Sequence, residues 1–513
     1  MAIGPSGHND VYLFHLDTFL SHITQHSSAA ALTLKDHSGD DRTGELAKMV
    51  KLLQTEYRPY FLFGAGSNEH NQLLMPRVGS ASNSSSDGLE SDGQIVAKDS
   101  LDIKEVHELA EMLLVVPRQC KNDDASSANV NHKPLSLHAG GGHSALLTHG
   151  GMLYLWGWNQ AGQLGRLGDS FSKSLVEGAA LSESSPLAYI PPLSNIKVAT
   201  VSLGHTHTLV IEKDTGRLFG FGENGRGQVD GFIQGNTPIG SWHKPRTPLS
   251  LSEDYFVDAA AGLFHSAAIT NEGELVTWGC GRFGQCLQLE ETKGEYVSNT
   301  TTIGRWKTPD GSKLVHVVCG RRHTAILDEL GRVWTLGDNK YGQLGRVESS
   351  STSLSKTPQL VEGPLGQAGS GCFAIMNGWS HILALVRSEN SEDITLYGWG
   401  RNDKGQLGMR SGKGSITKPT SLSNNSNVSI IQSACCGSES SHVLDVKNNI
   451  WGCGWNEHGN LGIGRYHQQD NNDYECCWTL ETVTGTRIVA PPPSVGEGRI
   501  FAAGGAHLIV MAT

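Results

Sequence analysis

The chain has 513 residues, of which 63 are glycine, and its formal net charge at pH 7 is −11. The high glycine content, with only 18 prolines and no Gly-X-Y triplet, excludes collagen and indicates a globular protein with many turns. The negative charge disfavours nucleic acid as the main ligand, and no apolar run reaches the ~18–20 residues that a membrane span needs.

Residues 1–57 carry no copy of the repeat that fills the rest of the chain and are expected to form an N-terminal extension. The segment Glu45–Tyr57 places Leu46, Val50 and Leu53 on one helical face, which predicts a short amphipathic helix that packs on the main domain or binds a partner. The first 20 residues contain no lysine or arginine, so we expect a cytosolic or nuclear protein. The ten cysteines include no Cys-x-x-Cys pair and are expected to be reduced thiols.

A polar tract lies in the N-terminal fifth of the chain. Residues 80–92 (SASNSSSDGLESD) lack the apolar side chains that a core requires, and they predict a disordered insertion over about residues 76–112. We expect this tract to interrupt a single domain over residues 58–513, not to separate two domains.

A Gly-x-x-His motif recurs through the remaining sequence. Six copies have this spacing, and a seventh, from Gly437 to His442, is two residues longer. Successive histidines lie 58 to 65 residues apart, which is too regular for chance among 22 histidines. The seven histidines are His143, His207, His265, His323, His381, His442 and His507.

A second motif has the same period. It consists of an aromatic residue or leucine followed by glycine, and in most copies an asparagine and a Gly-Gln-Leu-Gly turn come next. Glycine adopts positive φ at little cost, which suits such turns. The seven copies begin at Phe63, Trp156, Phe219, Trp278, Leu336, Tyr397 and Trp451.

Short apolar segments split by a turn lie between the two motifs, for example at residues 144–157 and 324–337. Their length of four to six residues and their content of Leu, Val, Ile and aromatic residues indicate β-hairpins. A small antiparallel sheet cannot bury both faces alone, so the copies are expected to stack radially. The sequence therefore predicts an all-β, seven-bladed propeller.

The two ends of the array complement each other. The array opens at Phe63 with the second motif alone and ends at His507 with the first motif alone. If residues 60–63 pair with residues 508–511, they form one composite blade, and the ring has no free sheet edge. We expect the N- and C-terminal strands to close the propeller in this way.

The two-part repeat resembles the regulator-of-chromosome-condensation (RCC) family, whose pattern is G-x-x-H-[ST]-x-x-L followed by W-G-x-N-x-x-G-Q-L-G. The resemblance covers nearly all of residues 58–513 and implies the propeller fold. The copies at residues 140–165, 378–408 and 454–459 are similar to the branch of secretion-regulating guanine nucleotide exchange factors. The last copy is also similar to the fungal alpha-tubulin-suppressor proteins.

The resemblance implies two modes of action. One is nucleotide exchange on a small GTPase. The other is an adaptor that holds a small metalloprotein in Elongator-dependent tRNA wobble-uridine modification and diphthamide synthesis.

Catalytic and cofactor interpretations of the motifs are weaker. The matches to G-x-G-x-x-G at residues 220–225 and 279–284 recur at the repeat period and lack the following helix of a dinucleotide site. The repeat histidines diverge around a ring and cannot converge on one metal ion. We expect each to make a buried hydrogen bond to the backbone, and we predict no catalytic residue, no metal and no cofactor.

The two residues inside each Gly-x-x-His motif vary in chemistry from copy to copy, although symmetry places them as a ring on one face. Aromatic residues and arginine are the types enriched in protein-interface hot spots. We therefore predict a monomeric, non-catalytic propeller whose ring binds a protein partner; the alternative is a ring of solvated turn residues. The candidate residues are His205, Phe264, Arg321, Arg322, Trp379 and Glu439.

Overall fold

The computed structural model of the protein describes residues 11–15, 57–67, 105–117, 133–165, 187–190, 196–230, 242–246, 251, 253–287, 303–347, 353–388, 393–409, 414–422, 428, 430–463, 476–482 and 499–512. Nearly all regular structure in these ranges is β-strand, together with one 3-10 helix, η2 (Pro364–Gly366). Within these ranges, no helix has the length and apolar character to cross a membrane.

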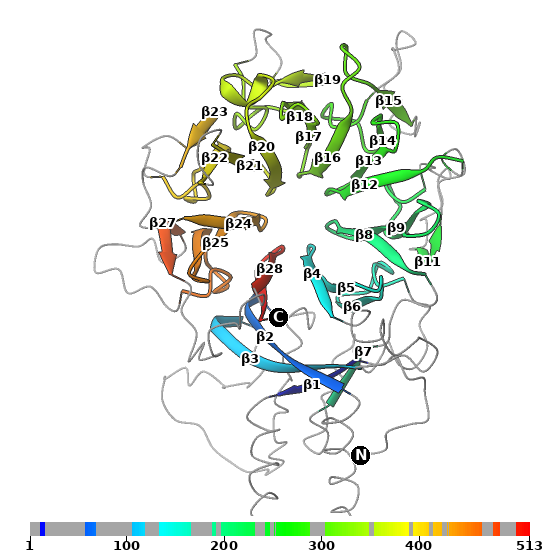
Figure 1. The fold of residues 1–513 in the computed structure, drawn as a ribbon, viewed down its shortest axis with the longest axis vertical. Coiled ribbons are helices and arrows are strands. Elements are labelled where there is room, and N and C mark those ends of the chain that lie inside the picture. The colour runs from blue at the N-terminus through cyan, green and yellow to red at the C-terminus, as the bar shows by residue number, and fades with distance from the viewer. Residues whose placement is uncertain are drawn as a thin grey trace, which may run out of the picture.

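The strands form seven sheets that surround a central opening as the blades of a propeller (Figure 1). The predicted seven-bladed propeller is therefore confirmed. We number the blades 1 to 7 from β4. Blade 1 consists of β4 (Pro134–Ala139), β5 (His143–Thr148) and β6 (Leu153–Gly157).

Blades 2 to 6 are four-stranded antiparallel sheets. Their strands are β8 (Val198–Leu203), β9 (His207–Glu212), β10 (Leu218–Gly222) and β11 (Trp242–Arg246) in blade 2; β12 (Phe256–Ala261), β13 (His265–Thr270), β14 (Leu275–Gly279) and β15 (Gly304–Trp306) in blade 3; β16 (Leu314–Cys319), β17 (His323–Asp328), β18 (Val333–Asp338) and β19 (Leu354–Leu360) in blade 4; β20 (Cys372–Asn377), β21 (His381–Arg387), β22 (Ile394–Arg401) and β23 (Ser415–Ser421) in blade 5; and β24 (Ile431–Cys436), β25 (Ser440–Asp445), β26 (Ile450–Trp455) and β27 (Cys476–Thr482) in blade 6.

Blade 7 joins the two ends of the chain. Its inner strands are β28 (Arg499–Ala503) and β29 (His507–Ala512), and β29 pairs with β2 (Tyr57–Ser67), in which Phe63 lies opposite Val510. The predicted closure of the ring is thus confirmed. Each end satisfies backbone groups of the other, so β29 has a partner strand on both sides, β28 and β2.

The outer part of blade 7 was not expected from the sequence. β3 (Glu105–Pro117) pairs with β2, β1 (Val11–His15) pairs with β3, and β7 (Leu187–Ile190) pairs with β1. The N-terminal extension therefore contributes a strand to this sheet.

The predicted insertion and helix fall mostly outside the described residues. Residues 105–112, which we assigned to the end of the insertion, belong to β3 and pair with β2, which satisfies backbone groups along one edge; β1 pairs with the other edge from Met112 onward. The predicted helix at Glu45–Tyr57 lies outside the described residues except for Tyr57, which begins β2.

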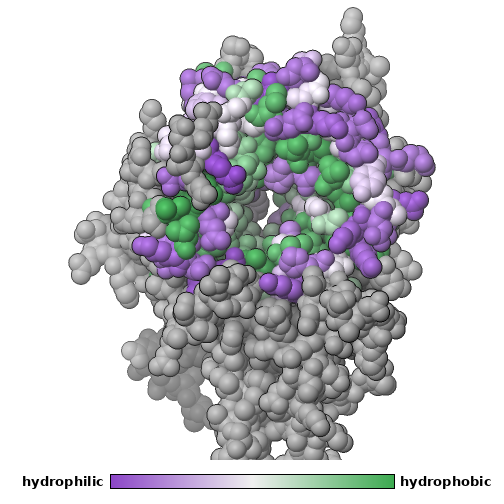
Figure 2. Space-filling model, viewed as in Figure 1, coloured by the Kyte–Doolittle hydropathy of each residue, from purple (hydrophilic) through white to green (hydrophobic). Residues whose placement is uncertain are grey.

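The core of the propeller lies between adjacent blades. Phe221 of blade 2 packs in a cluster with Leu155 of blade 1, and Trp278 of blade 3 packs with Leu209 of blade 2. Each fully buried apolar side chain contributes about 1.5–3 kcal/mol relative to exposure. Because both sides of a blade are covered, every residue of a central strand such as β17 is buried, including its polar residues. Figure 2 shows hydrophobic residues gathered around the central opening and hydrophilic residues over much of the rim.

The second motif forms a turn that its own side chains hold together. In blade 1, Asn159 Oδ1 accepts the backbone N–H of Leu164 at 2.9 Å, and Gln163 Oε1 accepts that of Ala161 at 3.0 Å. The same pair of bonds recurs at Asn339 and Gln343 of blade 4. Gly162 has φ 80°, a left-handed conformation that other residues adopt at a cost. The Asn and Gly-Gln positions of the motif are therefore fixed by local turn chemistry.

Candidate partner-binding face

Seven main-chain hydrogen bonds link adjacent blades in a closed circle at one mouth of the central opening. In each bond, an N–H inside one Gly-x-x-His motif donates to a carbonyl oxygen in the same turn of the next blade, at 2.8 to 3.4 Å. The donor and acceptor residues are Gly141 and Gly204, His205 and Gly262, Leu263 and Gly320, Arg321 and Trp379, Trp379 and Ser438, Ser438 and Gly504, and Gly505 and Gly140.

This circle explains the first glycine of the motif. A Cβ atom on Gly204 would lie 2.6 Å from the carbonyl oxygen of Gly262 and 2.8 Å from Cε1 of His207. The turn of the next blade and the motif's own histidine ring therefore leave no space for a side chain.

The repeat histidines reach across to the next blade. At five of the seven junctions, Nε2 lies 2.9 to 3.1 Å from a Ser or Thr hydroxyl. We had expected a bond to the backbone, but the central strands present their side chains to the neighbouring blade, so a hydroxyl is the nearer partner. The five pairs are His143 and Thr208, His207 and Ser266, His265 and Thr324, His381 and Ser441, and His507 and Ser144.

The hydroxyl in turn donates a hydrogen bond to a backbone carbonyl. Ser266 Oγ donates to the carbonyl oxygen of Gln228 at 2.6 Å, and Thr324 Oγ1 donates to that of Gln285 at 2.8 Å. Since the hydroxyl proton is used in this way, the hydroxyl oxygen must accept the Nε2–H of the histidine. We call this chain of histidine, hydroxyl and glutamine carbonyl the relay.

Two junctions lack the relay. Between blades 4 and 5, Ile382 occupies the hydroxyl position, and His323 Nε2 has no hydrogen-bond partner among the described residues. In blade 6, the position of the repeat histidine is held by Ser440, which lies opposite Gly454 as His381 lies opposite Gly400. The seventh motif is therefore not two residues longer, as we had assigned it. His442 is buried two positions further along β25 and is not the equivalent of the other six.

Burial keeps the repeat histidines neutral. It lowers the pKa of His143, His207 and His323 to about 3, and that of His265, His381 and His507 to about 4. The histidine without the relay and those with it are shifted alike, so desolvation and not the hydroxyl sets the shift.

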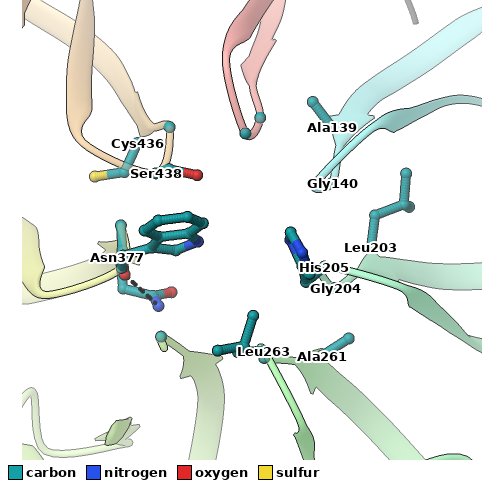
Figure 3. A pocket seen from close by; sticks show the side chains of 18 of the residues that line it. Ala139, Gly140, Leu203, Gly204, His205, Ala261, Leu263, Asn377, Cys436 and Ser438 are labelled. Carbon is teal, nitrogen blue, oxygen red and sulfur yellow. Dashed lines mark hydrogen bonds between the residues drawn. The ribbon is translucent and has the colours of Figure 1, made fainter. Parts of the chain in front are cut away.

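The residues between glycine and histidine surround a pocket at this mouth (Figure 3). Turn residues of all seven blades line it, among them His205, Leu263 and Trp379, and its volume is ≈ 90 Å³. Pockets for small organic ligands usually have about 300–1,000 Å³. This pocket has room for a few water molecules or one side chain of a partner.

Trp379 is the centre of the predicted ring. Its indole lies 6.2 Å from the ring of His205 in an edge-to-face arrangement, and the guanidinium carbon of Arg321 lies 5.2 Å from the indole centroid. Its backbone N–H and C=O both take part in the circle of inter-blade bonds. The structure thus brings three of the six predicted residues together.

The other predicted residues contact the outer turns. Arg322 lies with its guanidinium carbon 3.9 Å from the ring centroid of Phe283. Glu439 forms an ion pair with Arg401, and burial raises the pKa of Glu439 although Arg401 opposes the shift. Phe264 is half-buried, and its carbonyl accepts the N–H of Cys280 at 2.8 Å.

Sequence reasoning missed a second set of surface residues on the same face. Arg282 and Phe283, and likewise Lys340 and Tyr341, directly precede the Gly-Gln of the second motif. These two positions vary between copies in the same way as those inside Gly-x-x-His, and that variation could have identified them.

The opposite ends of the inner strands have a different character. In blades 1 to 6 the register of the inner strand shifts at its second residue, which marks a β-bulge. Four of these bulged residues are large, apolar and 41 to 46% exposed: Leu135, Val257, Val315 and Phe373. The exposed Phe373 and the half-exposed Trp379 thus lie beyond opposite ends of the inner strand of blade 5.

The described part of the chain contains no group of three or more His, Cys, Asp or Glu residues that could hold a metal ion.

Comparison with known proteins identifies the family to which the chain belongs. The model of the RCC1-like domain matches residues 61–510, which is most of the chain. The chain belongs to the RCC1-like domain family. This RCC1-like chain is 29% identical to the secretion-regulating guanine nucleotide exchange factor of Mus musculus over 403 residues, 73% of this chain and 75% of the relative. It is also 29% identical to the ultraviolet-B receptor UVR8 of Arabidopsis thaliana over 342 residues, 66% of this chain and 69% of the relative.

A solved structure supports the fold of the RCC1-like propeller. Prp20p from Saccharomyces cerevisiae, described with its binding properties to Gsp1p and histones, superposes with a TM-score of 0.61 and 20% identity, covering 90% of this chain and 94% of Prp20p. The resemblance to the RCC family that the repeat suggested is therefore confirmed, and a regulatory or interaction role is the common theme.

Proposed function

We propose that this protein binds a protein partner through the Gly-x-x-His mouth and acts as a guanine nucleotide exchange factor for a small GTPase. One observation carries the proposal. The first glycine and the histidine of each turn are fixed by packing, whereas the residues between them differ in chemistry from blade to blade and include the half-exposed Trp379 with Arg321 stacked beside it. Aromatic residues and arginine in a shallow recess are typical of interface hot spots.

Exchange needs no acid or base from the propeller. A regulator accelerates nucleotide release when it binds the nucleotide-free partner more tightly than the loaded one, since a ligand shifts an equilibrium only through differential affinity. The pocket at the mouth is too small for a nucleotide, so the contact would be made with the partner's surface. The relationship to the mouse exchange factor supports this mode.

The test combines capture with kinetics. Arg321→Ala, Arg322→Ala and Trp379→Ala are compared with Val315→Ala and Phe373→Ala, which remove exposed apolar groups from the opposite face of the same two blades. We expect the first set to abolish partner capture with an unchanged melting temperature, and the control set to leave capture intact. Equal capture by all variants would contradict the proposal.

Release of labelled GDP from a panel of small GTPases then separates two modes of action. Acceleration by the unmodified protein, lost in Trp379→Ala, supports exchange. Absence of acceleration with co-purification of a small zinc protein would contradict exchange and favour the adaptor role.

A further inference from the structure

We propose that the partner-binding face contains a site for an acidic peptide segment, formed by an arc of cationic and aromatic side chains on blades 3 to 5. We define the basic–aromatic arc as Arg282, Phe283, Arg321, Arg322, Lys340, Tyr341, Trp379, Arg401 and Lys404. The inference rests on the proposed function in that the peptide belongs to the protein partner.

The arc is built from cations stacked on rings. Arg322 lies over Phe283 at 3.9 Å, and Arg282 lies over the same ring at 5.7 Å. Arg401 lies over Tyr341 at 5.0 Å, and Lys340 lies over that ring at 5.2 Å. With Arg321 over Trp379, three aromatic rings hold five cations on three consecutive blades.

The arc carries unbalanced positive charge. Its six cations face three carboxylates. Those of Asp403 and Glu439 are paired with Arg401, and that of Asp338 accepts the backbone N–H of Lys340. Among the described residues, no ion pair engages Arg282, Arg321, Arg322 or Lys340. The protein as a whole has a net charge of −11, so this local positive charge is opposite in sign to the rest. A concentrated field of this kind attracts an anionic partner and orients its approach.

The stacked geometry favours carboxylates over nucleic-acid bases. A guanidinium group that lies on an aromatic face keeps its N–H edge free, and this edge binds a carboxylate through two parallel hydrogen bonds. Arg322 and Arg401 already lie over the rings of Phe283 and Tyr341, which leaves less ring surface for stacking on bases. The adjacent pocket of ≈ 90 Å³ has room for one apolar side chain of the same segment.

Binding of a model peptide tests the site directly. Fluorescein-labelled octaglutamate is titrated with the full chain and followed by fluorescence anisotropy, with octalysine and octathymidylate as parallel ligands. We expect binding of octaglutamate that weakens as salt increases, and no binding of octalysine.

The matched variants are Arg321→Glu and Arg387→Glu. Both reverse one charge that lies over an aromatic ring: Arg321 lies over Trp379, and Arg387 lies over Phe373 at 4.9 Å on the opposite face. We expect Arg321→Glu to weaken octaglutamate binding at least tenfold and Arg387→Glu to change it less than twofold. Equal effects of the two variants, or tighter binding of octathymidylate than of octaglutamate, would overturn the inference.

Failure of this inference can be told apart from failure of the proposed function. If octaglutamate does not bind while Trp379→Ala abolishes partner capture, the acidic-peptide site is wrong and the proposed function stands. If octaglutamate binding is lost in Arg321→Glu while capture and GDP release are unaffected by the mouth variants, the peptide site stands and the proposed function is wrong.

Discussion

The junction between blades 2 and 3 and the junction between blades 4 and 5 are both closed by an inter-blade backbone bond but differ in side-chain chemistry. At the first, His207 donates to Ser266, which donates to the carbonyl of Gln228. At the second, Ile382 is buried where the hydroxyl would be, and His323 is left without the relay. Both junctions keep an inter-blade backbone bond and an apolar cluster. The ring can therefore close without the relay, whose role is to stabilise a junction that backbone and apolar packing already define.

The junction between blades 4 and 5 is also irregular in its backbone. Asn377 Nδ2 donates to the carbonyl of Gly378 at 3.2 Å, and Arg321 N–H donates to the carbonyl of Trp379 instead of that glycine. The repeat thus departs from its regular pattern at the residues that form the centre of the candidate site.

The largest expected effect is the pH dependence of the free energy of unfolding, to which the repeat histidines contribute together. Their pKa is about 3 to 4 in the folded protein against an ordinary value of 6.5, so the folded state keeps them neutral. The stability they contribute is present above pH 6.5 and is lost as the pH falls towards the folded values, by about 1.4 kcal/mol per histidine and pH unit. Six such groups predict that the free energy of unfolding falls steeply between pH 6.5 and pH 5. His316 acts in the opposite sense, because Asp258 raises its pKa against the effect of burial.

Urea unfolding between pH 7.5 and 5 measures this loss. His207 takes part in the relay and His323 does not. If burial and not the relay sets the pKa, His207→Gln and His323→Gln should reduce the pH dependence of the free energy of unfolding equally. A profile independent of pH, or one flattened only by His207→Gln, would contradict the expectation.

A smaller effect isolates the relay. Thr324→Val keeps the shape of the side chain but leaves the Nε2–H of His265 and the carbonyl of Gln285 without the hydroxyl, which should lower the free energy of unfolding by about 1–3 kcal/mol. The matched control is Ile382→Val at the junction without the relay, which should cost about 0.5–1.5 kcal/mol through the lost methylene alone. Urea midpoints compare the two, and a cost no larger for Thr324→Val would show that the relay contributes nothing.

The smallest effect comes from installing the missing hydroxyl. In Ile382→Thr and Ile382→Val the new side chains have the same shape, but only threonine has a hydroxyl. This hydroxyl can accept the Nε2–H of His323 and donate to the carbonyl of Gln343. That carbonyl already accepts the indole N–H of Trp399 at 3.0 Å. We expect the Thr variant to be more stable by about 0.5–1.5 kcal/mol in urea unfolding, and the difference to vanish in His323→Ala. A more stable Val variant would mean that this junction cannot accommodate the relay.

Much of the propeller could be predicted because its repeat is dictated locally. The turn glycines, Asn159 and Gln163 serve the backbone of their own turn, so their spacing alone indicated the blade. The closure through β2 and β29 followed from the complementary half-motifs. The strands β1 and β3 could not be inferred, since their pairing depends on an edge of blade 7 that no local motif marks.

The candidate site was predicted only in part. The ring of Arg321 and Trp379 followed from symmetry, whereas the stacking of Arg322 on Phe283 joins two turns of different blades. The sequence also assigned His442 as a repeat histidine, because counting residues cannot tell a shifted histidine from a substituted one. Only the pairing of Ser440 with Gly454 decides it.

The sequence by itself thus determined the number of blades and the family, because glycine conformations, turn-forming side chains and strand patterns act within one repeat. It also indicated the closure of the ring, because each end of the array carries the half-motif that the other lacks. The tertiary structure decided which hydroxyl each histidine meets, where the relay is missing and which cations share an aromatic ring. Those contacts join neighbouring blades, and their chemistry depends on side chains that a repeat motif leaves free to vary.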